Sequence, residues 1–175
     1  MLGVRWSRRR LVVLLACVLP ACSKPPAPAA LVTNPRPLFM AFVQAWNRHD
    51  YASLDTLIAS DAIEEDLALG FQGEGPKAFK DFMGRTLGMF PDFNWRPTNV
   101  VAEGSKLAAE WTLTGTYTGN TPQGPVKGKR FSIRGASAMV SHAGKITRFS
   151  DYYSLDELYR QVMPPAPAKR RVSTK

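Results

Sequence analysis

The chain has 175 residues, 45% of them hydrophobic and 21% charged, a composition that predicts one globular domain with a packed core. The formal net charge is +9, but nine of the 23 lysines and arginines lie within the first 24 and last seven residues, and the body between is neutral. A neutral body argues against a nucleic-acid partner, and the lack of cysteine after Cys22 excludes disulfides, thiol catalysis and cysteine-based zinc sites from that body.

The N-terminal residues have the pattern of an export signal. A positively charged stretch, Arg5–Arg10, precedes an apolar run, Leu11–Ala21, that is too short to span a membrane. The run ends in Leu-Pro-Ala before Cys22, which resembles the lipobox of bacterial lipoproteins. We interpret residues 1–21 as a lipoprotein signal peptide and Cys22 as the lipidated residue. Lipidation at Cys17 and an ordinary secretory peptide are the alternatives.

The segments that flank the body predict a tether and a tail. Residues 22–36 are rich in Pro and Ala, like an extended linker that holds a domain away from a bilayer. Ser23 directly after the cysteine resembles the sorting signal that directs lipoproteins of double-membrane bacteria to the outer membrane. We expect an exported protein, anchored by its lipid to the outer membrane and facing the periplasm. The basic residues 164–175 are predicted to be a disordered tail.

The first half of the body has helical periodicity. Apolar residues repeat at helical spacing over 38–46, and a second, short helix is expected at 54–58. Residues 62–69 are a strand candidate. A third helix is predicted at 75–90, because Pro76 suits the first helical turn and a Pro-Asp pair follows residue 90.

From about residue 95 the apolar residues recur at every second position instead of at helical spacing. This pattern predicts four strands, at 95–102, 106–118, 126–141 and 145–153. The sequence Ser-Leu-Asp-Glu from Ser154 has the form of a capping box that begins a final helix. Helices followed by a run of antiparallel strands predict an α+β fold, with the helices on one face of a curved sheet.

Four segments together carry a family resemblance. They are FVQAWNRHDYASLDTLIASDA, GPKAFKDFMGRTLGMFPDFNW, VVAEGSKLAAEWTLTGTYTG and FSIRGASAMVSHAGKITRFSDYYSLDELYRQV. Their order and wording resembles the SnoaL-like polyketide cyclases of the nuclear-transport-factor-2-like superfamily, over residues 37–163. The resemblance implies a cone-shaped sheet wrapped by helices around an apolar pocket, no cofactor, and a homodimer formed through the sheet.

Asp151 is the leading catalytic candidate. The resemblance places it where the cyclases carry their acid/base carboxylate. Apolar walls raise the pKa of a carboxyl group toward the range of a general acid/base at neutral pH. The alternative is a structural ion pair of Asp151 with Arg134 or Arg148.

Glu110 is the second catalytic candidate. By resemblance to limonene epoxide hydrolases of the same superfamily, it takes the place of a second pocket carboxylate. Those enzymes place an arginine two residues earlier, where this chain has Ala108, which argues against epoxide hydrolysis. The alternative is a solvated strand face that Glu110 shares with Thr112 and Thr114, opposite Trp111.

Asp66 matches the place of the proton-shuttling base in ketosteroid isomerases. That chemistry needs an oxyanion hole made by a Tyr and a protonated Asp. Phe42 and Ala136 stand in those places here, which argues against isomerisation of steroids. The alternative for Glu64, Glu65 and Asp66 is a solvated acidic edge.

The remaining features predict a small-molecule pocket without a metal. Two histidines far apart in the sequence do not make a zinc site. Residues 70–75 are interpreted as a turn over the pocket mouth. We expect the pocket to be lined by an apolar shell with a few polar groups, which includes Phe42, Trp46, Asp66, Trp111 and Tyr153.

Two functions remain open. The first is a cofactor-independent cyclase or isomerase that acts on a hydrophobic carbonyl compound, with Asp151 moving the proton and Glu110 or a Tyr orienting the substrate. The second is a non-catalytic lipoprotein that binds an apolar ligand or docks a partner in the cell envelope.

Overall fold

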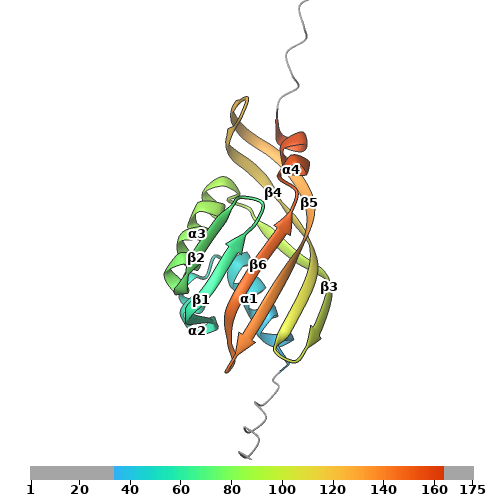
Figure 1. The fold of residues 1–175 in the computed structure, drawn as a ribbon. Coiled ribbons are helices and arrows are strands. Elements are labelled where there is room, and N and C mark those ends of the chain that lie inside the picture. The colour runs from blue at the N-terminus through green and yellow to red at the C-terminus, as the bar shows by residue number, and fades with distance from the viewer. Residues whose placement is uncertain (1–33, 164–175) are drawn as a thin grey trace, which may run out of the picture. The chain divides into compact units, whose positions relative to one another are not determined.

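The computed structural model describes residues 34–163 (Figure 1). The predicted signal peptide, the lipidation site and the C-terminal tail lie outside these residues, as does all but the end of the predicted tether. Within the described part, no helix is both long and apolar enough to cross a membrane.

One six-stranded sheet forms the framework of the fold. Its strands lie in the order β2-β1-β6-β5-β4-β3, and all neighbours are antiparallel except β1 and β6, which are parallel. The strands are β1 (Ile58–Asp66), β2 (Phe71–Glu74), β3 (Asn94–Glu103), β4 (Lys106–Thr121), β5 (Gly124–His142) and β6 (Lys145–Tyr153). The predicted α+β fold with a curved sheet is confirmed, and the four later strands lie where the period of two placed them.

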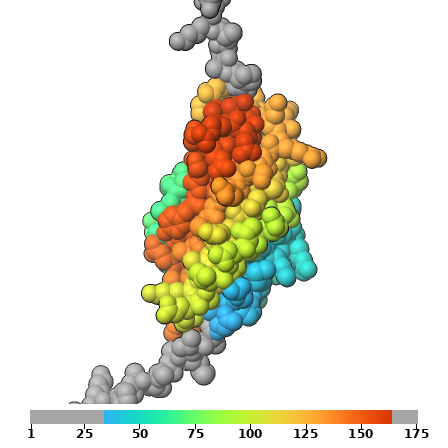
Figure 2. Space-filling model, turned by 90° about the vertical axis from the view of Figure 1, so that its right-hand side faces the viewer, coloured from blue at the N-terminus to red at the C-terminus, as the bar shows by residue number. Residues whose placement is uncertain are grey.

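Four helices complete the fold of residues 34–163: α1 (Arg36–Asn47), α2 (Tyr51–Leu57), α3 (Gly75–Met89) and α4 (Leu155–Val162). Prolines at the first turns of α1 and α3 suit helix starts, where their missing N–H groups are not needed. Ser154 caps α4, because its side chain accepts a hydrogen bond from the N–H of Glu157. Figure 2 shows α1 and α4 at opposite ends of one side of the molecule, with β3 to β5 between them.

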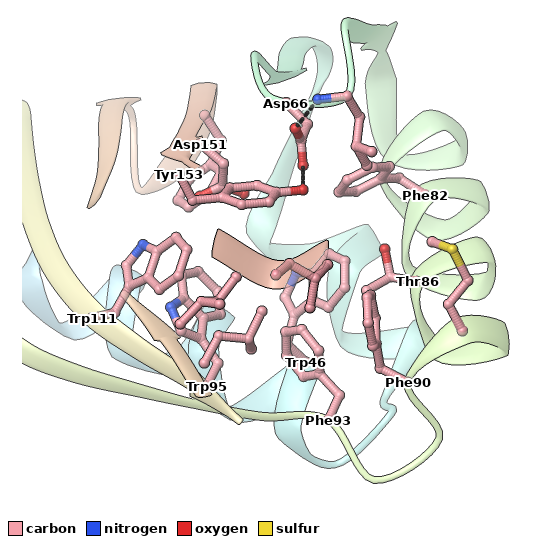
Figure 3. Close-up of a pocket in the computed structure, with 16 residues that line it drawn as sticks. Trp46, Asp66, Phe82, Thr86, Phe90, Phe93, Trp95, Trp111, Asp151 and Tyr153 are labelled. Carbon is pink, nitrogen blue, oxygen red and sulfur yellow. Dashed lines mark hydrogen bonds between the residues drawn. The ribbon is translucent and has the colours of Figure 1, made fainter. Parts of the chain in front are cut away.

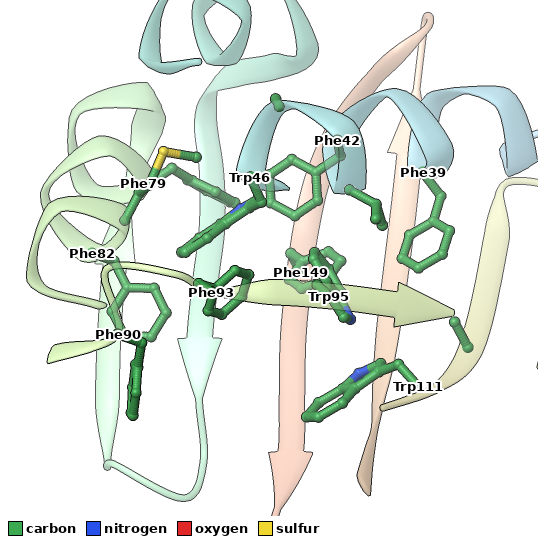
Figure 4. Close-up of a cluster of buried hydrophobic side chains, with 14 of the residues drawn as sticks. Phe39, Phe42, Trp46, Phe79, Phe82, Phe90, Phe93, Trp95, Trp111 and Phe149 are labelled. Atoms are coloured by element: carbon green, nitrogen blue, oxygen red, sulfur yellow. The ribbon is translucent and has the colours of Figure 1, made fainter. Parts of the chain in front are cut away.

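The core is built from aromatic side chains of α1, α3 and the sheet (Figure 4). Phe42 is fully buried and contacts Trp46, Phe79, Trp95 and Phe149 through ring centroids 4.8 to 6.2 Å apart. Most of these contacts are edge-to-face, the geometry that aromatic quadrupoles favour. The aromatic cluster therefore fixes the helices on the sheet.

A side chain at the end of α1 sets the position of β3. Asn47 donates from Nδ2 to the carbonyl of Trp95 at 2.8 Å and accepts from the N–H of Trp95 at 2.7 Å. Since both backbone groups of Trp95 are bound in this way, its indole ring is held in place under α1.

The first hairpin differs from the prediction. Residues 70–75 were expected to be a turn, but Phe71–Glu74 form β2, which pairs with β1, and α3 begins directly after it. The ring of Phe71 stacks on Phe82 of α3, with centroids 4.7 Å apart. This tertiary contact holds a strand of four residues, which is too short to show a period in the sequence.

Candidate functional site

A pocket opens between the sheet and α1, α3 and α4, with a cavity of about 60 Å³ (Figure 3). Most of its lining is apolar or aromatic: Trp46, Leu69, Phe82, Met89, Phe90, Phe93, Trp95, Trp111, Leu113, Ile133, Phe149 and Leu158. Four polar side chains complete the lining: Asp66, Thr86, Asp151 and Tyr153. An apolar wall with a few convergent polar groups is the usual form of a small-molecule site.

Alternation along β6 delivers the central polar groups. Successive side chains of a strand point to opposite faces of the sheet. Phe149, Asp151 and Tyr153 therefore share one face, and all three line the pocket. The sequence prediction that Asp151 faces an apolar pocket agrees with this geometry.

Asp151 is held by a short chain of hydrogen bonds. The indole Nε1 of Trp111 donates to Ser137 Oγ at 2.8 Å, and Ser137 Oγ donates to Asp151 Oδ1 at 2.5 Å. Asp151 is half-buried because it lines the cavity, and protein atoms surround it on the other sides. Desolvation raises the pKa of Asp151 to about 7, against the lowering effect of the bond from Ser137.

The expected alternative, an ion pair of Asp151 with an arginine, is absent from the described residues. Arg148 instead binds Glu65 at 2.6 Å on the opposite face of the sheet. Without a cation beside it, the carboxyl group of Asp151 keeps a raised pKa that suits proton transfer at neutral pH.

Asp66 lies beside Asp151 across the parallel pair of β1 and β6. Its Oδ2 accepts from the hydroxyl of Tyr153 at 2.9 Å, and its Oδ1 accepts from the N–H of Leu69 at 2.8 Å. Burial raises the pKa of Asp66, while these two hydrogen bonds act in the opposite direction. The pocket thus holds two neighbouring carboxyl groups, with Tyr153 bound to one of them.

A third acid, Glu64, is buried next to this pair and was not predicted from the sequence. It is 1% exposed, and its Oε2 has no hydrogen-bond partner among the described residues. Desolvation and then the charges of Asp151 and Asp66 raise the pKa of Glu64 well above its usual value.

The interpretation of residues 64–66 as a solvated acidic edge is therefore wrong for two of its three members. Glu64 and Asp66 point inward with Ala62, at a spacing of two residues in β1, and only Glu65 faces outward. The sequence did not show which face is buried, because the outward face of β1 carries the apolar Ile63 beside Glu65.

Two predicted site residues lie outside the pocket. Glu110 is exposed on the opposite face of β4, because the inward positions of that strand belong to its neighbours Ala109 and Trp111. Its expected place in the pocket is wrong, and the solvated strand face is what the structure shows. Phe42 is wholly enclosed in the core behind the pocket and does not line it. Trp46, Asp66, Trp111 and Tyr153 do line it, as expected.

Within residues 34–163, no group of three histidine, cysteine or acidic side chains is arranged to hold a metal ion.

Solved structures of other proteins share this fold. A protein of ketosteroid isomerase-like fold from Catenulispora acidiphila, in complex with trimethylamine, is 26% identical with a TM-score of 0.64, over 74% of this chain and 93% of that one. A candidate polyketide cyclase from Xanthomonas campestris is 25% identical with a TM-score of 0.62, over 72% and 94%. A candidate polyketide cyclase from Streptomyces antibioticus is 19% identical with a TM-score of 0.65, over 73% and 96%.

None of the curated proteins compared with the chain matches it significantly. The family model described as SnoaL-like polyketide cyclase matches residues 38–162, which include every strand and helix of the described structure except the first two residues of α1. The chain therefore belongs to the SnoaL-like polyketide cyclase family.

Proposed function

We propose that this protein catalyses a cofactor-independent cyclisation or isomerisation of a hydrophobic carbonyl compound, with Asp151 as the group that moves the proton. One observation carries the proposal: a carboxyl group with a pKa of about 7 lies in an aromatic pocket, fixed by Ser137. A general base works best when its pKa lies near the working pH. A sufficient fraction of it is then ionised, and the ionised form still binds a proton strongly.

The proposed step needs only the side chains of the pocket. The carboxylate of Asp151 removes a proton from the carbon next to a carbonyl group, and the C–H electron pair forms the double bond of an enolate. In a cyclisation, the enolate carbon attacks a second carbonyl group of the same molecule. Asp151 then returns its proton to the new alkoxide, so the enzyme ends in its starting state. Tyr153, which holds Asp66, would orient the substrate in place of Glu110.

This proposal predicts exchange of carbon-bound protons. Aromatic ketones incubated with the protein in D₂O should take up deuterium next to the carbonyl group, observed by proton NMR. The exchange rate at low substrate concentration should rise from pH 5 and level off above about 7, because only the ionised form of Asp151 accepts a proton. A panel of ketones that shows no exchange above the buffer rate, or a rate independent of pH over this range, would argue against Asp151 as the base.

A second candidate function is ligand binding without turnover. It is favoured by the hydroxyl of Tyr153, which is already bound to Asp66 and so is not free to stabilise an enolate. The protein from Catenulispora acidiphila, described in complex with trimethylamine, is consistent with capture of a small molecule by this fold. Saturable binding of a ligand that undergoes no exchange would support this function over the first.

We also propose that the domain is tethered in the cell envelope through a lipid on Cys22. The lipobox-like residues before this cysteine and the Pro- and Ala-rich segment after it support the proposal. Replacing Cys22 by Ser should move the protein from the membrane fraction to the soluble fraction of bacterial cells, as judged by immunoblot after ultracentrifugation. A Cys17→Ser variant serves as the control and should remain with membranes. Retention of the Cys22→Ser variant with membranes would show that the anchor is elsewhere.

A further inference from the structure

The charged groups that line the pocket are all acidic. Of the 16 lining residues, Asp66 and Asp151 carry carboxyl groups, and none is a lysine, arginine or histidine. Glu64 adds a third carboxyl group, close enough that the charges of the other two raise its pKa. Its unpartnered Oε2 is a buried acceptor that the described side chains do not satisfy.

The arginine whose charge affects this cluster is not among the residues that line the pocket. Arg85 of α3 lowers the pKa of Glu64, but its side chain is exposed and its guanidinium lies over the ring of Phe71, 4.7 Å from the centroid. The polar side chains among the lining residues are thus two acids, one phenol and one threonine hydroxyl, beside tryptophans whose indole N–H groups in Trp46 and Trp95 have no partner among the described residues. Buried carboxyl groups are stabilised either by a proton or by a countercharge, and in their ionised form these acids would pair with a cation that the described side chains do not supply.

The aromatic walls of the pocket suit a bound cation. Trp46, Trp95 and Trp111 line the cavity, together with Phe90 and Phe93 (Figure 3). Aromatic faces attract cations, and tryptophan does so most strongly. The cavity of about 60 Å³ has room for roughly four to six water-sized groups, which is the size of a compact head group.

We infer that the pocket binds a compact organic cation, the head group of a protonated tertiary amine or a quaternary ammonium, with its charge at Asp66 and Asp151 and its alkyl groups against the tryptophans. This inference rests on the proposed function, because it concerns the ligand of the same pocket: the carbonyl compound would carry an amine. The bound cation favours the ionised form of Asp151, which is the form that accepts a proton.

A matched pair of probes tests the charge alone. Choline and 3,3-dimethylbutan-1-ol have the same shape, but only choline is charged. Titrated into the full-length chain at pH 8, choline should bind at least tenfold more tightly, measured by calorimetry and by the fluorescence of the pocket tryptophans. Because the charge of choline does not change with pH, its affinity should fall as the pH drops from 8 to 5 and the carboxyl groups take up protons.

Two variants locate the binding site. Asp66→Asn should remove most of the advantage of choline over its neutral analogue, whereas Glu110→Gln, a control on the outer face of β4, should leave it unchanged. Thermal unfolding of Asp66→Asn shows whether that variant folds, and the comparison of the two probes on the unmodified chain does not depend on it. Equal affinity for the two probes, or a preference for the neutral one, would overturn the inference.

The outcomes separate this inference from the proposed function. Deuterium exchange on neutral ketones with no preference for choline would leave the catalytic role of Asp151 standing and remove the cationic ligand. A preference for choline with no exchange on any ketone would support the cationic ligand and leave the domain as a binding module.

Discussion

Replacement of Asp151 by Asn should reduce the rate of deuterium exchange by about 10²–10⁴-fold, because the amide cannot accept the proton. The amide retains an oxygen that can accept the hydrogen bond from Ser137, so the chain from Trp111 through Ser137 is preserved. Glu110→Gln is the matched control: it makes the same chemical change in an exposed carboxylate of β4 and should exchange at the rate of the unmodified chain.

Stability provides the second measurement on this variant. The pKa of Asp151 is about 7 in the folded chain and near 3.8 when unfolded, so the folded state holds more protons between these values. The contribution of Asp151 to the free energy of unfolding therefore falls as the pH rises from about 4 to about 7. The Asp151→Asn variant lacks this pH-dependent loss, because the amide does not titrate. At pH 8, Asp151→Asn should unfold at the same temperature as the unmodified chain or a higher one. A variant that keeps its exchange activity would contradict the assignment of Asp151 as the base, and one that unfolds at a lower temperature at pH 8 would contradict the raised pKa.

The fold was largely predictable because its long elements carry strong periodic signals. β4, β5 and β6 are nine or more residues long, parts of β4 and β5 alternate between buried and exposed side chains, and α1 and α3 have apolar stripes. The parallel pairing of β1 with β6 was not predictable in this way, since it joins segments about 85 residues apart and depends on the completed sheet. This pairing is what places Asp66 next to Asp151.

The site residues were predictable where the sequence shows which side chains of a strand share a face, and not elsewhere. Asp151 and Trp111 lie on inward faces that the alternation of β6 and β4 specifies. Glu110 was assigned to the pocket by resemblance, although it is adjacent to Trp111 in the strand and therefore points to the opposite face. Glu64 was missed because a run of three acidic residues suggests solvent, while the burial of two of them follows from the position of β1 in the interior of the sheet.

A variant at Phe42 tests whether this ring belongs to the packed core or to the ligand pocket. The sequence suggested the pocket, whereas the structure encloses the ring completely. Phe42→Ala should cost about 3–5 kcal/mol of unfolding free energy, because it removes a fully buried ring and leaves a cavity among four aromatic neighbours. For a domain of this size the melting temperature should fall by roughly 10–20 °C, measured by circular dichroism.

A control on the same helix separates packing from a general effect on α1. Met40 is 37% exposed, and Met40→Ala should shift the melting temperature by only a few degrees, because surface substitutions rarely cost more than about 0.5 kcal/mol. If Phe42→Ala melts as late as Met40→Ala, the ring contributes little packing and the enclosure of Phe42 is incorrect. If it melts early, the ring holds α1 on the sheet, and the walls formed by Trp46 and Trp95 depend on it although it never touches the ligand.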